Sequence, residues 1–237
     1  VTLDGGTSWA SLSSGTNSFL RGVHFVSSTQ GWIVGDDSTI LMTADGGATW
    51  TAQTNPASGA LYGVHFVDST NGAAVGDSGL ILTTSNGGTS WTDVSPSGLG
   101  TSRLRKVAFG SADAGWTVGH GDLVLGTTNS GASWNTQSHP GSPPVWFGLD
   151  AIDASTAWAC GQNGNVIATT DGGVSWISQG TNASVSLNEV SFADENTGWV
   201  VGDSGEVYAT VDGGSNWDLQ PTPGADHLFS VSFADNE

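Results

Sequence analysis

The sequence predicts an all-β fold built from repeated four-stranded units, and three observations carry this prediction. The pattern Thr-x-Asp/Asn-x-Gly-x-x-Trp occurs six times, and its tryptophans at positions 9, 50, 91, 134, 176 and 217 are spaced by 41 to 43 residues. Between these copies the chain alternates short apolar, β-branched runs with Gly, Asp and Ser. No run has a sustained helical period, so a fixed repeat of this length indicates an array of stacked β units.

The second repeat shows the expected elements in chain order. Residues 20–26 and 31–35 are apolar runs that predict two strands, joined by a polar turn at 27–30. A turn at 36–38 leads to a third strand at 39–43, and Gly46 and Gly47 can then take the positive φ angles of a tight turn. The fourth strand is expected at 48–53. Four short antiparallel strands in about 42 residues are typical of a β-propeller blade.

We expect one propeller domain over residues 1–237, with complete blades at about 19–53, 60–94, 103–137, 146–179 and 187–220. A sixth blade is split between residues 228–237 and residues 1–10. Aligning its halves on the second repeat leaves the 12 positions 30–41 without a counterpart, so one interpretation is a six-bladed ring cut within one blade. The alternative is a stretch of a longer array with seven blades. In either case the chain is expected to be a fragment of a longer protein.

The repeated Thr-x-Asp/Asn-x-Gly-x-x-Trp pattern, or box, is expected to be structural. Its acid or amide can accept hydrogen bonds from turn amides, its Thr hydroxyl can hold the preceding strand, and its Trp can pack beneath neighbouring strands. The residues assigned to this role are Asp4, Asp45, Asn86, Asn129, Asp171, Asp212, Trp9, Trp50, Trp91, Trp134, Trp176 and Trp217. The box resembles the Asp-box of BNR-type propellers, which are found in sialidases and other secreted proteins. The full repeat, with Gly198-Trp199-Val200-Val201-Gly202-Asp203-Ser204-Gly205 before the box, resembles the photosystem II assembly and stability factor family, and this resemblance implies seven blades.

Charge and composition exclude several classes of partner. The 22 acids outnumber the four bases and give a formal charge of −18, so neither nucleic acid nor an anionic lipid surface is expected to bind. No apolar run is long enough to span a bilayer, and no signal peptide is visible. The acidity leaves cationic partners, metal ions, sugars or neutral protein surfaces open, or it serves solubility alone. Cys160 is the only cysteine, so it cannot form an internal disulfide, and it is expected to be buried.

The residues argue against catalysis. A sialidase-like site needs three arginines from different blades, a Tyr nucleophile and an acid pair, but two of the three arginines, Arg103 and Arg105, share one strand. His24 and His65 occupy the same repeat position and are interpreted as tolerated strand residues rather than metal ligands. Acids such as Asp203 occur once per blade, too far apart for calcium, so neither a metal nor a cofactor is expected.

The start of the first strand in each repeat gives the candidate partner site. A nearly constant Leu there is followed by a residue that varies in size and chemistry, and Arg and aromatic side chains are enriched in binding hot spots. The candidate partner-binding residues are Arg21, Tyr62, Arg103, Arg105, Lys106, Trp146, Phe147, Asn188 and Phe229. Three of them, Arg103, Arg105 and Lys106, form a basic cluster. The resemblance to the photosystem II assembly and stability factor family implies that such a basic patch binds a partner. Trp146 replaces the constant Leu and is either an exposed aromatic anchor or a filler of a wider gap between blades.

These observations favour a non-catalytic interaction or scaffold propeller that binds a protein partner or belongs to a larger surface assembly. A carbohydrate-binding or sialidase-like glycoside hydrolase propeller, with a glycan partner, is the alternative. A purely structural element of a larger assembly is a third interpretation. An extracellular, cell-surface, lumenal or periplasmic location is expected, without insertion into a membrane.

Overall fold

Twenty strands form five four-stranded antiparallel sheets in the computed structural model, which describes residues 1–2, 4–141, 143 and 145–233. The chain is therefore a β-propeller, and each sheet is one blade. Blade 1 contains β1 (Leu20–Phe25), β2 (Gly31–Gly35), β3 (Ile40–Thr43) and β4 (Thr51–Ala52). Blade 2 contains β5 (Leu61–Phe66), β6 (Gly72–Gly76), β7 (Ile81–Thr84) and β8 (Thr92–Asp93). Blade 3 contains β9 (Leu104–Phe109), β10 (Gly115–Gly119), β11 (Val124–Thr127) and β12 (Asn135–Thr136).

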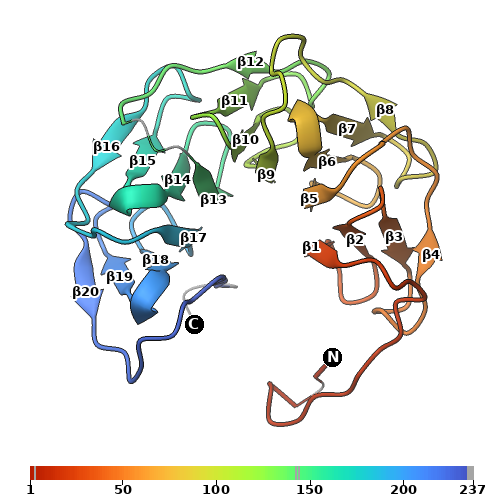
Figure 1. The fold of residues 1–237 in the computed structure, drawn as a ribbon, viewed down its shortest axis with the longest axis horizontal. Helices are drawn as coiled ribbons and strands as arrows, with labels where there is room; N and C mark the ends of the chain where they lie inside the picture. The colour runs from red at the N-terminus through yellow and green to blue at the C-terminus, as the bar shows by residue number, and fades with distance from the viewer. Residues whose placement is uncertain (3, 142, 144, 234–237) are drawn as a thin grey trace.

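The last two blades have longer outer strands than the first three. Blade 4 contains β13 (Trp146–Ala151), β14 (Ala157–Gly161), β15 (Val166–Thr169) and β16 (Ile177–Gln179). Blade 5 contains β17 (Leu187–Phe192), β18 (Gly198–Gly202), β19 (Val207–Thr210) and β20 (Asp218–Gln220). The blades are arranged in an open ring, with β1, β5, β9, β13 and β17 around the centre and β4, β8, β12, β16 and β20 outside (Figure 1).

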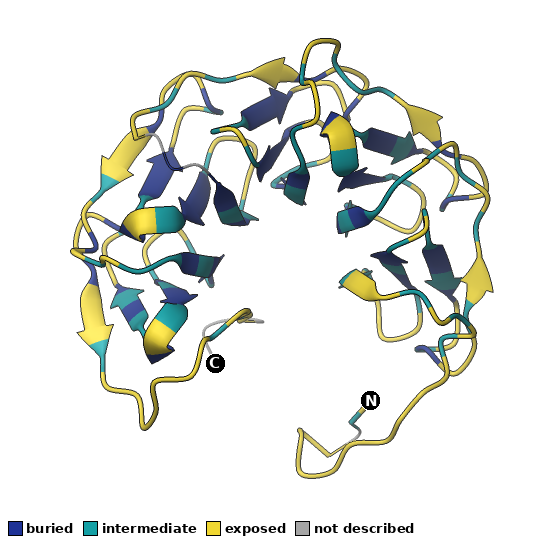
Figure 2. Ribbon diagram, in the orientation of Figure 1, coloured by how far each residue is buried: buried dark blue, intermediate teal, exposed yellow. Residues whose placement is uncertain are grey.

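The blades are joined by aromatic rings that pack across each boundary. Trp32 of β2 stacks on Phe66 of β5 with ring centroids 3.5 Å apart, and Trp158 of β14 stacks on Phe192 of β17 at the same distance. The box Trp of each blade then packs edge-on, as Trp91 does against Phe66 at 5.8 Å. These rings are almost fully buried, and each buried aromatic removes about 150–250 Å² from water. The core therefore lies between blades, as the dark strands of Figure 2 show.

In the five blades, the Asp-boxes lie in the hairpins between the third and fourth strands. In blade 1 the Thr43 hydroxyl donates to Asp45 Oδ1 at 2.8 Å and accepts from the amide of Gly47 at 2.9 Å. The other Asp45 interactions include the amide and hydroxyl of Thr49. The Thr49 hydroxyl and amide, followed by the Thr43 hydroxyl, lower the pKa of Asp45 to about 2. The box therefore fixes the hairpin between β3 and β4 through one carboxylate and one hydroxyl.

We expect Thr43→Val to destabilise the protein by about 1–3 kcal/mol, because it leaves the amide of Gly47 buried without an acceptor. Thr2 makes the same bond to the amide of Gly6, but at an exposed position where water can replace it. Thr2→Val should therefore cost less than about 0.5 kcal/mol. Urea unfolding monitored by circular dichroism measures both, and equal losses would contradict this account of the box.

The two halves of the expected sixth blade lie at the opening of the ring. Residues 1–2 and 4–10 belong to a box hairpin closed by hydrogen bonds between Val1 and Ala10. The segment 228–233 runs along blade 5, where Leu228 bonds to Gly202 at 3.0 Å and Phe233 stacks on Trp199 at 3.8 Å. This is where the first strand of a next blade would lie, but neither half forms a strand within the described residues. Residues 234–237 of the expected blade lie outside them, and the single-domain assignment stays a prediction.

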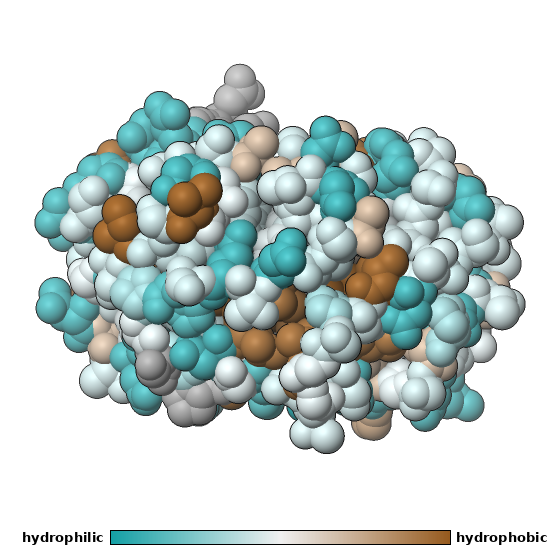
Figure 3. Space-filling model, turned by 90° about the horizontal axis from the view of Figure 1, so that it is seen from above, coloured by the Kyte–Doolittle hydropathy of each residue, from teal (hydrophilic) through white to brown (hydrophobic). Residues whose placement is uncertain are grey.

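The side of the ring that carries β12 is predominantly polar (Figure 3). Figure 3 views the ring from the side on which β12 lies, and brown apolar residues form separate groups among teal and white ones. The face of β1 is an exception, because no blade covers it: Val23 is 61% exposed, whereas its counterpart Val64 is 8% exposed (Figure 2). Within the described residues, no helix is long and apolar enough to cross a membrane.

Candidate functional site

One backbone irregularity occurs at the same place in all five blades. The register between the first and second strands shifts after the first residue, as between Leu20 and Gly22 in blade 1. The residue skipped by the ladder is the variable one: Arg21, Tyr62, Arg105, Phe147 and Asn188. A β-bulge of this kind re-aims a side chain away from the sheet. The residue type therefore differs from blade to blade at the five bulged positions.

These side chains line a central cavity of about 610 Å³. Its lining is Leu20, Arg21, Tyr62, Arg105, Lys106, Phe147, Ser186, Asn188, Glu189, Asp203, Phe229 and Ser230. Seven of the nine candidate residues predicted from the sequence are in this set. Arg103 lies beside it, with its guanidinium 4.5 Å from the centre of the Tyr62 ring. The structure therefore brings together the candidates chosen by comparing repeats, with the exception of Trp146.

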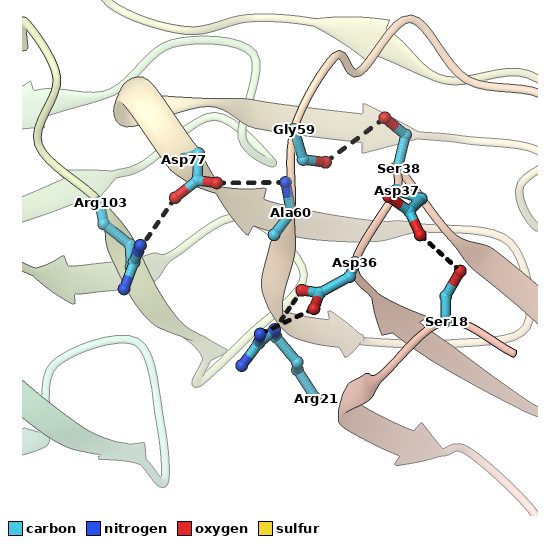
Figure 4. A network of polar contacts seen from close by, with 9 residues as sticks. All are labelled: Ser18, Arg21, Asp36, Asp37, Ser38, Gly59, Ala60, Asp77 and Arg103. Carbon is cyan, nitrogen blue, oxygen red and sulfur yellow. Dashed lines mark hydrogen bonds and ion pairs between the residues drawn. The ribbon is translucent and has the colours of Figure 1, made fainter.

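Arg21 and Arg103 are each paired with an acid from a turn between a second and a third strand (Figure 4). Arg21 forms an ion pair with Asp36, and its Nη2 donates to Asp36 Oδ2 at 2.8 Å. Arg103 Nε donates to Asp77 Oδ1 at 3.0 Å. Both guanidinium groups lie against Tyr62: the Arg21 group is 4.9 Å and the Arg103 group 4.5 Å from the centre of its ring. The recurring turn acids thus position cations, a role that the sequence did not reveal.

Arg105 differs from the other three bases in having no acid beside it. No hydrogen bond or ion pair joins its guanidinium to any residue that the structure describes, and it lies 5.0 Å from the centre of the Phe147 ring. Burial, followed by the nearby positive charge of Arg103, lowers the pKa of Arg105 from its usual value. A partly desolvated, unpaired cation at the wall of a cavity is a favourable site for an anionic group.

An ion pair inside the central cavity was missed at the sequence level. Lys106 of β9 pairs with Glu189 of β17, although 83 residues separate them. Both replace a glycine that the third position of the first strand usually holds, as at Gly63, where a Cβ would lie 2.9 Å from the carbonyl oxygen of Arg105. The larger side chains of Lys106 and Glu189 line the central cavity. Comparing the repeats at this position would have found the two opposite charges.

Lys106→Met should make stability depend more strongly on pH. Burial raises the pKa of Glu189, and Lys106 counteracts this shift. The folded state therefore binds the Glu189 proton more tightly than the unfolded state. The penalty of ionised Glu189 is full above the folded pKa, shrinks as pH falls from the folded to the unfolded pKa, and is absent below the unfolded pKa. We expect a loss of about 1–3 kcal/mol at pH 7.5, less than for a fully buried pair because Lys106 is 40% exposed, and a smaller loss at pH 4.

Urea titrations at the two pH values measure this difference. Adding Glu189→Gln to the Lys106→Met protein removes the titrating group, so the added pH dependence should vanish. A destabilisation of Lys106→Met that is equal at both pH values would contradict the pairing.

Trp146 does not contribute to the cavity wall. It is completely buried in a core cluster with Trp116 and Trp176, so the interpretation as an exposed anchor is wrong and the filler interpretation stays a prediction. β13 begins with Trp instead of Leu and ends with Ala151, where the other four first strands have Phe. Residues 142 and 144, in the loop before Trp146, lie outside the described residues.

His24 and His65 serve the junction between blades. His24 Nδ1 accepts a hydrogen bond from the amide of Phe66 at 3.2 Å, and Asp150 makes the equivalent bond to Phe192 at 2.7 Å. The histidine rings lie 4.3 Å apart, and burial together with His24 lowers the pKa of His65 to about 3. The part of the chain that the structure describes contains no group of three His, Cys, Asp or Glu side chains that could hold a metal ion.

The fold and the bulge residues define the class of this protein: a β-propeller of Asp-box blades with a cation-bearing cavity at its centre. Residues 3–94 and 52–189 match the family described as photosynthesis system II assembly factor YCF48. These matches span more than half of the chain, which therefore belongs to this family. The comparison with curated proteins gives no match.

Solved structures of low sequence identity share the fold. One described as YCF48 bound to D1 peptide is 18% identical with a TM-score of 0.61, over 88% of this chain and 82% of that one. YCF48 from Cyanidioschyzon merolae is 17% identical with a TM-score of 0.60, over 94% and 92% of the two chains. An ancestral GH74 enzyme has a TM-score of 0.74 at 16% identity, but the match covers 93% of this chain and only 33% of the enzyme.

Proposed function

We propose that this propeller is a non-catalytic module that binds a segment of a partner protein in its central cavity. The observation that carries the proposal is Arg105, an unpaired and partly desolvated cation between Tyr62 and Phe147 on the cavity wall. A carboxylate of the partner would pair with Arg105, and apolar partner side chains would contact the aromatic rings. The family supports a protein partner, because one of its members has been solved with a D1 peptide. A secreted or cell-surface location is part of this proposal.

Glycan binding is the second candidate, and the similarity to an ancestral GH74 enzyme favours it. Aromatic side chains such as Tyr62, Phe147 and Phe229 around a cavity also suit a sugar ring. Against hydrolysis, the cavity acid Glu189 is buried and paired with Lys106, and Asp203 is bonded to Asn188 and His227. Neither carboxylate is free to act as an acid opposite a second one.

Phage-displayed peptides selected on the wild-type protein, together with a glycan array and a fluorogenic glycoside assay, separate the two candidates. We expect the selection to enrich peptides that carry a carboxylate next to apolar residues, with no glycan binding and no hydrolysis. Enrichment of no peptide sequence, or glycan binding that is lost in Arg105→Ala, would reject the peptide-binding function.

A further inference from the structure

The outer rims of blades 4 and 5 carry apolar side chains that the other blades lack. Val174 and Ile177 of blade 4 are 86% and 62% exposed, and Val211 and Leu219 of blade 5 are 78% and 61% exposed. The other exposed large hydrophobic residues among those described all lie within residues 1–25 or 229–233, near the opening of the ring. The four equivalent positions in blade 2 are polar: Thr89, Thr92, Ser85 and Asp93. The repeat itself therefore does not require apolar residues there.

A groove of about 460 Å³ separates the rims of these two blades. Its walls include Ile177, Ser178 and Gln179 of β16 on one side and Glu195 and Asp212 of blade 5 on the other. The site is far from the central cavity along each blade, because β16 is an outermost strand and the cavity is lined by first strands (Figure 1).

Two other junctions show why this groove is open. Between blades 1 and 2, Gln53 donates to the carbonyl oxygen of Gly87 at 2.9 Å and accepts from the indole N–H of Trp91 at 3.2 Å. Between blades 3 and 4, Gln137 accepts from Trp176 at 2.8 Å. These glutamines fill the space between rims.

Gln179 occupies the same position at the junction of blades 4 and 5 but does not close it. Its side chain makes no hydrogen bond within the described residues, and the indole N–H of Trp217 is buried there without a partner. Both groups lie against Gly214, whose Cβ would be 3.2 Å from Gln179 Oε1 and from Trp217 Nε1. A buried donor without an acceptor is unusual in a folded protein. This junction therefore keeps unused polar groups beside an exposed apolar side chain.

Charge and strand pairing indicate the chemistry of an occupant. Residues 107–237 contain no Lys or Arg, so the acids that flank the groove, Glu195 and Asp212, have no basic residue of blade 4 or 5 to neutralise them. One edge of β16 pairs with β15, and no strand pairs with the other edge in the described structure. An exposed edge with apolar side chains is a template for an added strand.

We propose that the outer edge of β16 and the adjoining groove bind an extended, positively charged segment of a partner protein. The segment adds to blade 4 as a fifth strand through main-chain hydrogen bonds. One of its apolar side chains contacts Ile177, and its Lys or Arg side chains approach Glu195 and Asp212. This second surface is independent of the central cavity, which favours an anionic group.

The test uses a fluorescein-labelled hexapeptide of alternating Lys and Val, with alternating Glu and Val as the control peptide. Fluorescence polarisation should show that the Lys/Val peptide binds the wild-type protein and that Ile177→Lys weakens this binding at least tenfold. Thr92→Lys adds the same charge at the equivalent position of blade 2 and should leave the affinity within about twofold of wild type. The Glu/Val peptide should not bind.

Hydrogen exchange of the complex then distinguishes strand addition from attraction between charges. The amides of β16 should exchange more slowly with the Lys/Val peptide bound, and those of β8 should not change. Absence of binding, equal loss of affinity in Ile177→Lys and Thr92→Lys, or unchanged exchange in β16 would each overturn the proposal. If the Lys/Val peptide still binds the Arg105→Ala protein, it does not use the central cavity. Loss of Lys/Val binding in Arg105→Ala would also reject the proposed binding site at β16.

Discussion

Trp146→Ala is expected to destabilise the protein by about 3–5 kcal/mol, the range for deleting a buried aromatic side chain. Trp146 is fully buried in a core cluster formed by strands of blades 3 and 4, so the change leaves a cavity that the neighbouring sheets cannot easily fill. Guanidinium unfolding monitored by far-ultraviolet circular dichroism measures the loss.

The matched control is Trp9→Ala in the N-terminal box. Trp9 is 74% exposed, so its removal should cost less than about 0.5 kcal/mol. A Trp146→Ala protein as stable as Trp9→Ala would show that Trp146 is not the core residue described above.

Arg105→Ala should have the largest effect on partner binding. We expect a selected cavity-binding peptide to lose at least about thirtyfold in affinity, the size of a binding hot spot of about 2 kcal/mol, because its carboxylate loses the only cavity cation without an acid beside it. Isothermal titration calorimetry measures both affinities.

Arg103→Ala provides a control that removes the same charge two residues away. Arg103 is already paired with Asp77 and lies outside the cavity lining, so the loss should stay within about fivefold. Equal losses for the two variants would indicate long-range attraction rather than a specific contact with Arg105.

The strands could be predicted closely from the sequence because each repeat contains its own turn signals. The second strand at 31–35 and the first at 20–26 agree with β2 and β1. The fourth strand at 48–53 was predicted too long, since β4 is only Thr51–Ala52. Residues 48–50 belong to the box, where the amide of Thr49 bonds to the Asp45 carboxylate rather than to a neighbouring strand.

The site could be predicted in part. The variable residue after the constant Leu was identified from the repeats, because a position that the fold does not constrain is free to vary. The pairing of Lys106 with Glu189 could not be predicted from adjacent residues, since closure of the ring brings β9 and β17 to the same cavity. The burial of Trp146 could not be predicted either, because it depends on packing between the sheets of blades 3 and 4.

The rim groove illustrates the same limit. A Gln three residues after the box Trp occurs in four blades, and the sequence does not distinguish Gln53 and Gln137, which bond to the next blade, from Gln179, which does not. The difference lies in contacts between blades rather than in the repeat.

The central claim is that the bulged residues at the start of the first strands form the partner site. A nuclear magnetic resonance titration of the ¹⁵N-labelled protein with a selected peptide tests it most directly. The account predicts that the amide shifts change at Arg21, Tyr62, Arg105, Phe147 and Asn188, around the central cavity. Shift changes confined to the Asp-box hairpins, with none at these five residues, would contradict it.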